Sequence, residues 1–246
     1  MKQNRCVVIS GGDFSPVPGL TSEDFVIACD RGYAYCGRLR LRPDLIISDF
    51  DSYRGPVDAG IPLNRYASEK DDTDTMLAVR YAIAHGFREL LLCCALGGRL
   101  DHLIANLQSL VFARKHGLRA ALCSEDTEVF TLEGGAMRIP RRDGWSLSVF
   151  ALDGPCRGVC ISGAKYPLAN AELLPSFPLG VSNTWAAAEA ISRAAAKASS
   201  REGEERIYAC PMAEGLEKRI GSKTSGLLPS GQDPYRFSTL SIYFLF

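Results

Sequence analysis

The chain has 246 residues, 46% of them hydrophobic, and its 28 Lys and Arg balance its 28 Asp and Glu. This composition allows one large domain or two modest ones with a buried core, and it excludes the global basic field that nucleic-acid binding usually needs. The apolar run within Met1 to Ser10 is too short for a signal sequence or a membrane span. The nine cysteines lack C-x-x-C spacing, which indicates reduced structural thiols. We therefore expect a cytoplasmic protein that recognises its ligands locally, with neither nucleic acid nor a membrane as partner.

The first half of the chain alternates short apolar runs with helical stretches. The runs are Cys6 to Ile9, Phe25 to Cys29, Leu45 to Ser48, Leu90 to Leu96 and Ala120 to Cys123. Two helices are expected, one beginning near Thr73 and stopping at Gly86, the other beginning near Asp101 and ending at Gly117. This alternation predicts an α/β domain of the Rossmann-like kind, in which helices cover a parallel sheet.

Beyond Thr127 the pattern changes to short strands separated by turns. The expected strands are Glu128 to Leu132, Ala136 to Ile139, Trp145 to Leu152 and Gly158 to Ser162. An antiparallel β domain is therefore expected to follow the α/β domain, with the boundary at about residue 125.

The segment from about 186 to 236 differs in composition from the rest of the chain. Its alanine triplets and charged stretch favour helix or disorder, and Gly221 to Pro234 is typical of a linker. We expect roughly Ser199 to Pro234 to be mobile. Ser238 to Phe246 has strand character, and we expect it to complete the second domain or its dimer contact.

The first acidic motif, Asp49-Phe50-Asp51-Ser52, follows the expected strand Leu45 to Ser48. Residues two apart in extended chain point to the same side, so Asp49 and Asp51 would converge where the strand ends. Ligands of open α/β sheets bind at the carboxyl ends of strands. Turn formation and capping explain an isolated Asp-x-Asp equally well.

The second acidic motif spans residues 69 to 74 and directly precedes the first expected helix. Asp71 and Asp74 share a face of the first turn, while Asp72 or Thr73 can cap the helix. Acids also complement a helix dipole. Four acids within six residues repel one another unless a cation compensates, and Mg²⁺ prefers such hard oxygen ligands. The motif therefore indicates a nucleotide-metal site.

The third motif, Gly97 to His102, follows a strand and opens the second expected helix. Its glycines permit a sharp turn with exposed N–H groups, and Arg99 can fork onto a phosphate. Alternatively, Asp101 caps the helix and pairs with Arg99, and His102 fits a capping or core position as well as a catalytic one. The chain has no P-loop and no protein-kinase motif, so a phosphoryl-transfer enzyme would belong to another family.

Six motifs follow one another along the chain. They are Asp30-Arg31-Gly32, Asp49 to Ser52, Lys70 to Asp74, Gly97 to His102, Gly163 to Leu168 and Val181-Ser182-Asn183. In this order they resemble the motifs of the thiamine pyrophosphokinase family, and the resemblance spans about residues 5 to 185. Two positions depart from the family pattern: Ser48 stands where glycine is usual, and Met76 stands where an acid is common.

The resemblance implies a Mg²⁺-dependent thiamine diphosphokinase that transfers a diphosphate from ATP to the hydroxyl of thiamine and releases AMP. It implies an α/β domain that binds ATP and Mg²⁺ at residues 1–125 and a thiamine-binding β-sandwich at residues 126–246. It also implies a homodimer whose active sites lie at the subunit interface.

The same resemblance assigns a role to each matching residue. The catalytic set is Asp71, Asp49, Asp51, Arg99 and Asp101; the metal ligands are Asp49, Asp51, Asp71 and Asp74; the ATP-binding set is Asp30, Asp74, Arg99, Asp101 and His102; the thiamine side is Lys70, Tyr166, Ser182 and Asn183. The ring of Tyr166 would offer an aromatic face to a cationic ring, ordinary strand packing being the alternative.

Two rival functions remain at this stage. One is a related diphosphokinase acting on another small alcohol such as a pterin, because the metal motifs concern ATP rather than the acceptor. The other is a non-enzymatic ligand-binding protein that retains the fold. The first is distinguished by the acceptor that the protein phosphorylates, and the second by the absence of turnover.

Overall fold

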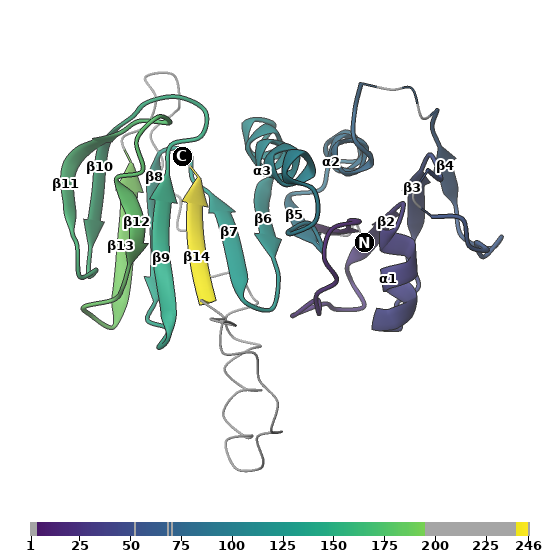
Figure 1. Ribbon diagram of the computed structural model, residues 1–246, viewed down its shortest axis with the longest axis horizontal. Helices are drawn as coiled ribbons and strands as arrows, with labels where there is room; N and C mark the ends of the chain where they lie inside the picture. The colour runs from purple at the N-terminus through teal and green to yellow at the C-terminus, as the bar shows by residue number, and fades with distance from the viewer. Residues whose placement is uncertain (1–3, 52, 68, 70, 195–239, 246) are drawn as a thin grey trace, which may run out of the picture. The chain divides into compact units, whose positions relative to one another are not determined.

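The computed structural model describes residues 4–51, 53–67, 69, 71–194 and 240–245. The chain divides into two compact units, Met1–Thr131 and Leu132–Phe246 (Figure 1). The division falls six residues beyond the boundary expected from the sequence, because strand β7 (Thr127–Thr131) pairs with β6 (Arg119–Cys123) and so belongs to the first unit.

The first unit is a parallel sheet covered by helices. Its remaining strands are β1 (Arg5–Ile9), β2 (Phe25–Cys29), β3 (Leu45–Ser48), β4 (Leu63–Arg65) and β5 (Glu89–Cys93). Within this unit the strand order is β7-β6-β5-β1-β2-β3-β4, in which β7 is antiparallel to β6 and the other neighbours are parallel. The predicted α/β domain is therefore confirmed.

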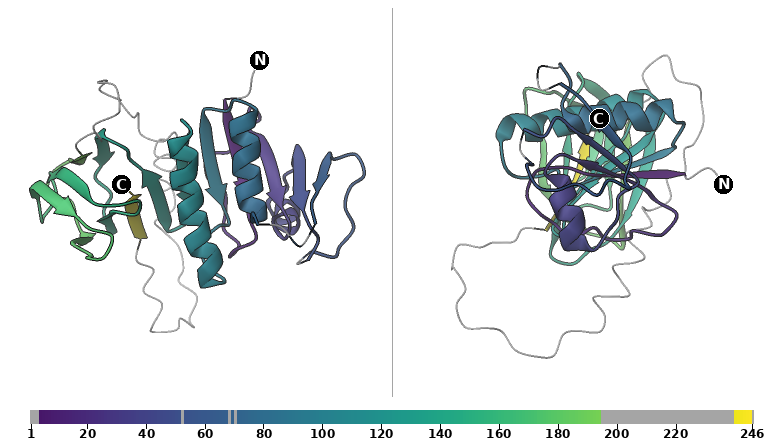
Figure 2. Two further views of the ribbon diagram at one scale, coloured as in Figure 1. Left: turned by 90° about the horizontal axis from the view of Figure 1, so that it is seen from above. Right: turned by 90° about the vertical axis from the view of Figure 1, so that its right-hand side faces the viewer.

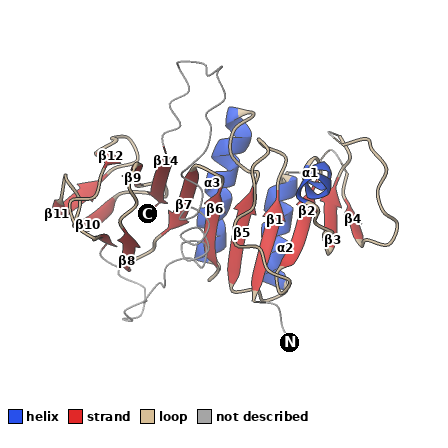
Figure 3. Cartoon of the chain, turned by 90° about the horizontal axis from the view of Figure 1, so that it is seen from below, coloured by secondary structure: helices blue, strands red, loops and turns tan. Residues whose placement is uncertain are grey.

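Continuous apolar runs form the central strands because both faces of the sheet are covered. Cys6, Val7, Val8 and Ile9 of β1 are all completely buried. Helices α2 (Asp74–Ala84) and α3 (Leu100–Lys115) lie on one face of the sheet, and α1 (Gly32–Leu39) lies on the other (Figures 2 and 3). None of these helices, in the part of the chain that the structure describes, has the length and apolarity of a membrane span.

The two expected helices are present, and their buried faces carry small or polar residues. In α2 the buried residues are Thr75, Ala78, Val79 and Ala82, and in α3 they are Asn106, Ser109, Leu110 and Ala113. Small side chains let a helix approach a sheet closely. Leu110 is the large apolar residue among the buried positions of α3, whereas Leu100 and Ile104 of the same helix are exposed.

The second unit contains two sheets of short strands. A four-stranded antiparallel sheet has the order β11-β10-β13-β8, formed by β8 (Gly135–Pro140), β10 (Cys156–Ser162), β11 (Leu168–Leu173) and β13 (Glu189–Ala194). In the other, β9 (Trp145–Phe150) lies between β12 (Gly180–Asn183) and β14 (Leu240–Leu245). This arrangement is the expected β-sandwich domain.

The end of the second unit corrects one expectation and confirms another. Residues 189–194, for which helix or disorder was expected, form β13, because Glu189 to Ala194 pair in register with Pro140 to Gly135. Ser238 to Phe246 was expected to supply a strand to this domain, and β14 pairs with β9, although in parallel rather than antiparallel orientation. The expectation for Ser199 to Pro234 lies outside the described residues.

Candidate functional site

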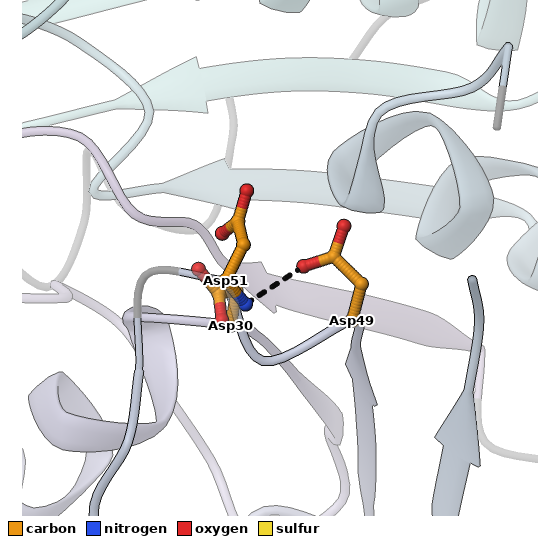
Figure 4. Close-up of side chains that lie close together, drawn as sticks. All are labelled: Asp30, Asp49 and Asp51. Carbon is orange, nitrogen blue, oxygen red and sulfur yellow. Dashed lines mark hydrogen bonds between the residues drawn. The ribbon is translucent and has the colours of Figure 1, made fainter. Parts of the chain in front are cut away.

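Three carboxylates gather where β2 and β3 end. These strands are parallel neighbours, with Cys29 opposite Ile47. Asp30 follows β2 directly and Asp49 follows β3, so parallel pairing brings them to the same edge of the sheet. Candidate ligand oxygens of Asp30, Asp49 and Asp51 all lie within 4.8 Å of one another. Figure 4 shows the three side chains crowded around the turn after β3.

Backbone conformation brings the carboxylates together. Asp30 and Phe50 have φ values of +46° and +62°, in the left-handed region that side-chain-bearing residues rarely adopt. The bend at Phe50 returns the chain so that the backbone N–H of Asp51 donates to Oδ1 of Asp49 at 3.1 Å. Two acids two residues apart therefore converge through a closed turn rather than through extended strand geometry.

The electrostatics of this group favour a bound cation. Asp30 is buried, and burial raises the pKa of its carboxyl; a hydrogen bond from Ser48 lowers it, and the charges of Asp51 and Asp49 raise it further. A positive charge beside closely spaced carboxylates offsets the repulsion between their negative charges. Hard oxygen donors of this kind fit Mg²⁺. Asp30, which the family resemblance assigns to ATP binding, lies beside Asp49 and Asp51.

The start of α2 carries the second acidic motif. Thr73 caps the helix, as expected, by accepting a hydrogen bond from the backbone N–H of Met76 at 3.1 Å. Asp71 is exposed and Asp74 opens the helix, and the close group at the ends of β2 and β3 includes neither of them. Lys70 lies outside the described residues.

The sequence pattern assigned no side-chain role to three residues that tie the start of α2 to the sheet, Ser10, Thr75 and Cys29. The hydroxyls of Ser10, at the end of β1, and Thr75 are buried and 2.8 Å apart. The Cys29 thiol donates to the backbone carbonyl of Asp74 at 3.4 Å. A polar residue at a strand end was the available signal for Ser10.

The glycine loop between β5 and α3 presents Arg99 to solvent. Gly97 and Gly98 have φ values of +69° and +67°, which glycine adopts without strain. Arg99 donates to both carboxylate oxygens of Asp101, at 3.1 and 2.5 Å, so the pairing considered as an alternative is present. His102 is exposed, and its backbone N–H donates to Asp101 at 2.9 Å. The hydrogen bond to Asp101 raises the pKa of Arg99, and the charge of Asp51 adds to this effect.

Residues beneath this loop hold its shape. The Asn106 amide, buried in α3, donates to the Ala95 carbonyl at 2.8 Å. Cys94, with a φ of +51°, accepts from the backbone N–H of Ser15 at 3.5 Å and donates to the Ser15 carbonyl at 3.4 Å. The glycine loop and the loop after β1 are thereby joined.

Three of the thiamine-side candidates, Tyr166, Ser182 and Asn183, belong to the second unit. The Oδ1 of Asn183 accepts from the backbone N–H groups of Tyr166 and Thr184, both at 2.9 Å, and its Nδ2 donates to the Tyr166 carbonyl at 2.6 Å. Asn183 is buried, whereas the Tyr166 side chain is 60% exposed. The ammonium of Lys165 lies 5.3 Å from the Tyr166 ring centroid. Ser182 has a φ of +57°, and its backbone N–H donates to the Ser148 hydroxyl at 3.1 Å.

Models of two domains of one protein family match the chain. Residues 19–122 match the model described as "Thiamin pyrophosphokinase, catalytic domain", and residues 136–192 match "Thiamin pyrophosphokinase, vitamin B1 binding domain". The first match covers β2 to β6 and contains all three clustered carboxylates. The second contains Tyr166, Ser182 and Asn183.

Individual proteins show the same similarity. The chain is 25% identical over 186 residues to the thiamine pyrophosphokinase of Bacillus subtilis (strain 168). The aligned region covers 72% of this chain and 87% of that protein. It is 27% identical over 151 residues to thiamine pyrophosphokinase 1 of Oryza sativa subsp. japonica, covering 55% and 56%. The crystal structure of the Bacillus subtilis thiamine pyrophosphokinase has a similar fold, with a TM-score of 0.70 at 20% identity over 78% of this chain and 94% of that chain.

Proposed function

The chain belongs to the thiamin pyrophosphokinase family, and on this basis we propose that it transfers a diphosphate group from ATP to the hydroxyl of thiamine, releasing AMP. The observation that carries the proposal is the meeting of Asp30, Asp49 and Asp51 within the segment that matches the catalytic domain. A phosphoryl-transfer site needs such a group to hold a metal against the phosphates.

We propose Mg²⁺ as the cofactor and Asp30, Asp49 and Asp51 as residues that hold it. Asp71 and Asp74, at the start of α2, are proposed as further ligands. When bound, the ion neutralises charge on the triphosphate and on the group being transferred. The closed turn at Phe50 fixes the spacing of Asp49 and Asp51, so little reorganisation is needed when the nucleotide arrives.

Arg99 is proposed to orient the triphosphate. Its guanidinium is exposed and positively charged, and a planar fork of donors matches phosphate oxygens. Asp101 accepts from Nε and Nη2 of Arg99 and so fixes the plane of the guanidinium, and the remaining N–H donors are proposed to meet the phosphate oxygens. The thiamine hydroxyl then attacks the β-phosphorus. Its oxygen forms one P–O bond as the P–O bond to the departing AMP breaks, and its proton passes to a carboxylate such as Asp71. The chain otherwise contributes positioning and charge stabilisation.

The acceptor is proposed to bind at residues of the second unit. Tyr166 presents an exposed aromatic face suited to a cationic ring, and Asn183 holds the backbone on both sides of that residue's Cα. Ser182 and Lys70 are proposed to line the same side. We further propose a homodimer with active sites shared between subunits, which the elution volume and light scattering of the purified protein would test.

Identifying the nucleotide product tests the proposed function. The purified protein is incubated with ATP, Mg²⁺ and thiamine, and a parallel reaction contains a pterin alcohol in place of thiamine. We expect AMP and thiamine diphosphate in equal amounts from the first reaction and no turnover in the second. ADP appearing in stoichiometry with phosphorylated thiamine would contradict the proposal, as would a preference for the pterin. A pterin acceptor is not favoured, because residues 136–192 match the vitamin B1 binding domain.

A further inference from the structure

Ser48, the last residue of β3, connects the separate parts of the acidic group. Its side chain is completely buried. The Ser48 hydroxyl donates to Oδ1 of Asp30 at 3.0 Å and accepts a hydrogen bond from the backbone N–H of Phe50 at 2.8 Å. One hydroxyl therefore joins the carboxylate that follows β2 to the turn that follows β3.

Both residues that Ser48 contacts have unusual backbone conformations. Asp30 and Phe50 have positive φ values of +46° and +62°. Such conformations persist when the surrounding structure over-determines them. The backbone around Ser48 is itself held on both sides of β3. The backbone N–H of Asp30 donates to the Ile47 carbonyl at 3.1 Å, and the backbone N–H of Tyr66 donates to the Ser48 carbonyl at 3.2 Å. The hydroxyl thus acts from a rigid position.

Removing the hydroxyl would free both of its partners. The Asp30 carboxylate would lose the hydroxyl that holds its Oδ1, and the Phe50 N–H would lose its acceptor. The turn could then open, which would change the separation of Asp30 from Asp49 and Asp51 without altering any of the three carboxylates.

We propose that Ser48 is a positioning residue that sets the spacing of Asp30 against the Asp49–Asp51 turn and thereby the affinity of the group for a divalent cation. The proposal deepens the proposed function, because it rests on the same three carboxylates as ligands. Groups that orient metal ligands typically contribute 10- to 100-fold to metal affinity or activity.

Direct titration with Mn²⁺ alone, followed by electron paramagnetic resonance, measures the affinity without substrate or turnover. We expect the dissociation constant of the full-length protein to rise on the order of 10-fold in Ser48→Ala. In the assay, the Mg²⁺ concentration for half-maximal rate should rise by a similar factor while the KM for thiamine stays unchanged. Ser48→Gly, which adds no atom to the buried site, should behave alike and provides a second variant if Ser48→Ala folds poorly.

Ser109→Ala is the matched control. Ser109 is also completely buried, and its hydroxyl donates to the Ala105 carbonyl at 2.8 Å in α3. This control should lower the melting temperature about as much as Ser48→Ala does, while leaving Mn²⁺ affinity unchanged. The inference is overturned if the wild-type protein binds no Mn²⁺, if both Ser48 variants keep wild-type affinity, or if Ser109→Ala weakens binding equally.

The same experiment separates this inference from the proposed function. A wild-type protein that forms no AMP, with Ser48 variants that nevertheless lose Mn²⁺ affinity, would refute the function and support the positioning role. Normal thiamine diphosphate synthesis together with unchanged Mn²⁺ binding in both variants would support the function and refute the positioning role of Ser48.

Discussion

The candidate residues of the two units differ in the partners of their polar atoms. In the first unit, turns and strand ends bring the carboxylates of Asp30, Asp49 and Asp51 together, so that like charges lie close to one another. In the second unit, Asn183 is buried and directs its amide to the backbone around Tyr166, while the Tyr166 ring remains exposed. Under the proposed function, the first group performs the chemistry, whereas the second supports a binding surface. Substitutions in the first should therefore lower kcat, and substitutions in the second should raise the KM for thiamine.

Asp49→Asn should have the largest effect on activity. The asparagine Oδ1 can still accept the hydrogen bond from Asp51, so the turn remains while one charge is lost. We expect kcat to fall on the order of 10²-fold with little change in the melting temperature. Steady-state kinetics and thermal unfolding measure the two quantities.

Asp58→Asn is the matched control for this substitution. Asp58 forms the same kind of turn, accepting from the backbone N–H of Gly60 at 2.8 Å, but it is exposed and pairs with Arg42. The kcat of the Asp58→Asn variant should match that of the wild type. If Asp49→Asn folds normally and is equally active, the acidic group is structural and the contrast between the two units disappears.

Arg99→Lys should have the next largest effect. Lysine keeps the positive charge but lacks the fork of donors, so kcat/KM for ATP should fall on the order of 10-fold. Arg157→Lys in the second unit is the control, because Arg157 is an exposed arginine paired with Glu172 at 2.9 Å. Equal effects of the two substitutions would show that the position of Arg99 has no special role.

Asn183→Ala should act through binding. It removes three hydrogen bonds around Tyr166 and Thr184, which should lower the free energy of unfolding by about 1–3 kcal/mol. The KM for thiamine should rise several-fold while kcat changes little. Asn183→Asp keeps the acceptor oxygen and should fall between the wild type and Asn183→Ala. A loss confined to kcat would mean that Asn183 takes part in the chemistry rather than in thiamine binding.

The smallest expected effect concerns the stability of the two units in acid. Burial of Asp24 acts to raise its pKa, but hydrogen bonds from Arg5 and Thr21 outweigh burial and lower the pKa below its ordinary value of 3.8. A carboxyl whose pKa is lowered by folding adds stability above its ordinary pKa, and this stability is lost as the pH falls through the folded-state value. Unfolding by urea should therefore become easier below about pH 4.

Asp24→Asn should flatten this dependence on pH. Asp143→Asn should not, because Asp143 forms an exposed pair with Arg141 in the second unit and exposed pairs contribute little. Urea unfolding curves recorded between pH 2.5 and 6 compare the two variants with the wild type. If the free energy of unfolding changes with pH equally in Asp24→Asn and the wild type, the buried pair with Arg5 has no role in acid stability.

Local sequence signals predicted some elements well and missed others. The strands β1, β2, β3 and β6 were expected within a residue of their observed bounds, because each is an apolar run that a doubly covered sheet requires. Strand β13 was missed because alanine triplets, at residues 186–188 and 194–196, flank this segment, and alanine favours helix. Pairing with β8 on one side and β10 on the other overrides that preference.

The sequence by itself determined the α/β half of the chain, the order of its motifs and the presence of acids at strand ends, because these depend on local composition and on residues close together along the chain. The tertiary structure decided that Asp30 joins Asp49 and Asp51, since parallel pairing of β2 and β3 unites residues far apart in sequence. It also decided that Ser48 bridges Asp30 and Phe50 and that Asn183 contacts the backbone of Tyr166. Hydrogen bonds of this kind depend on where separate strands end in space, and no spacing within one segment encodes that.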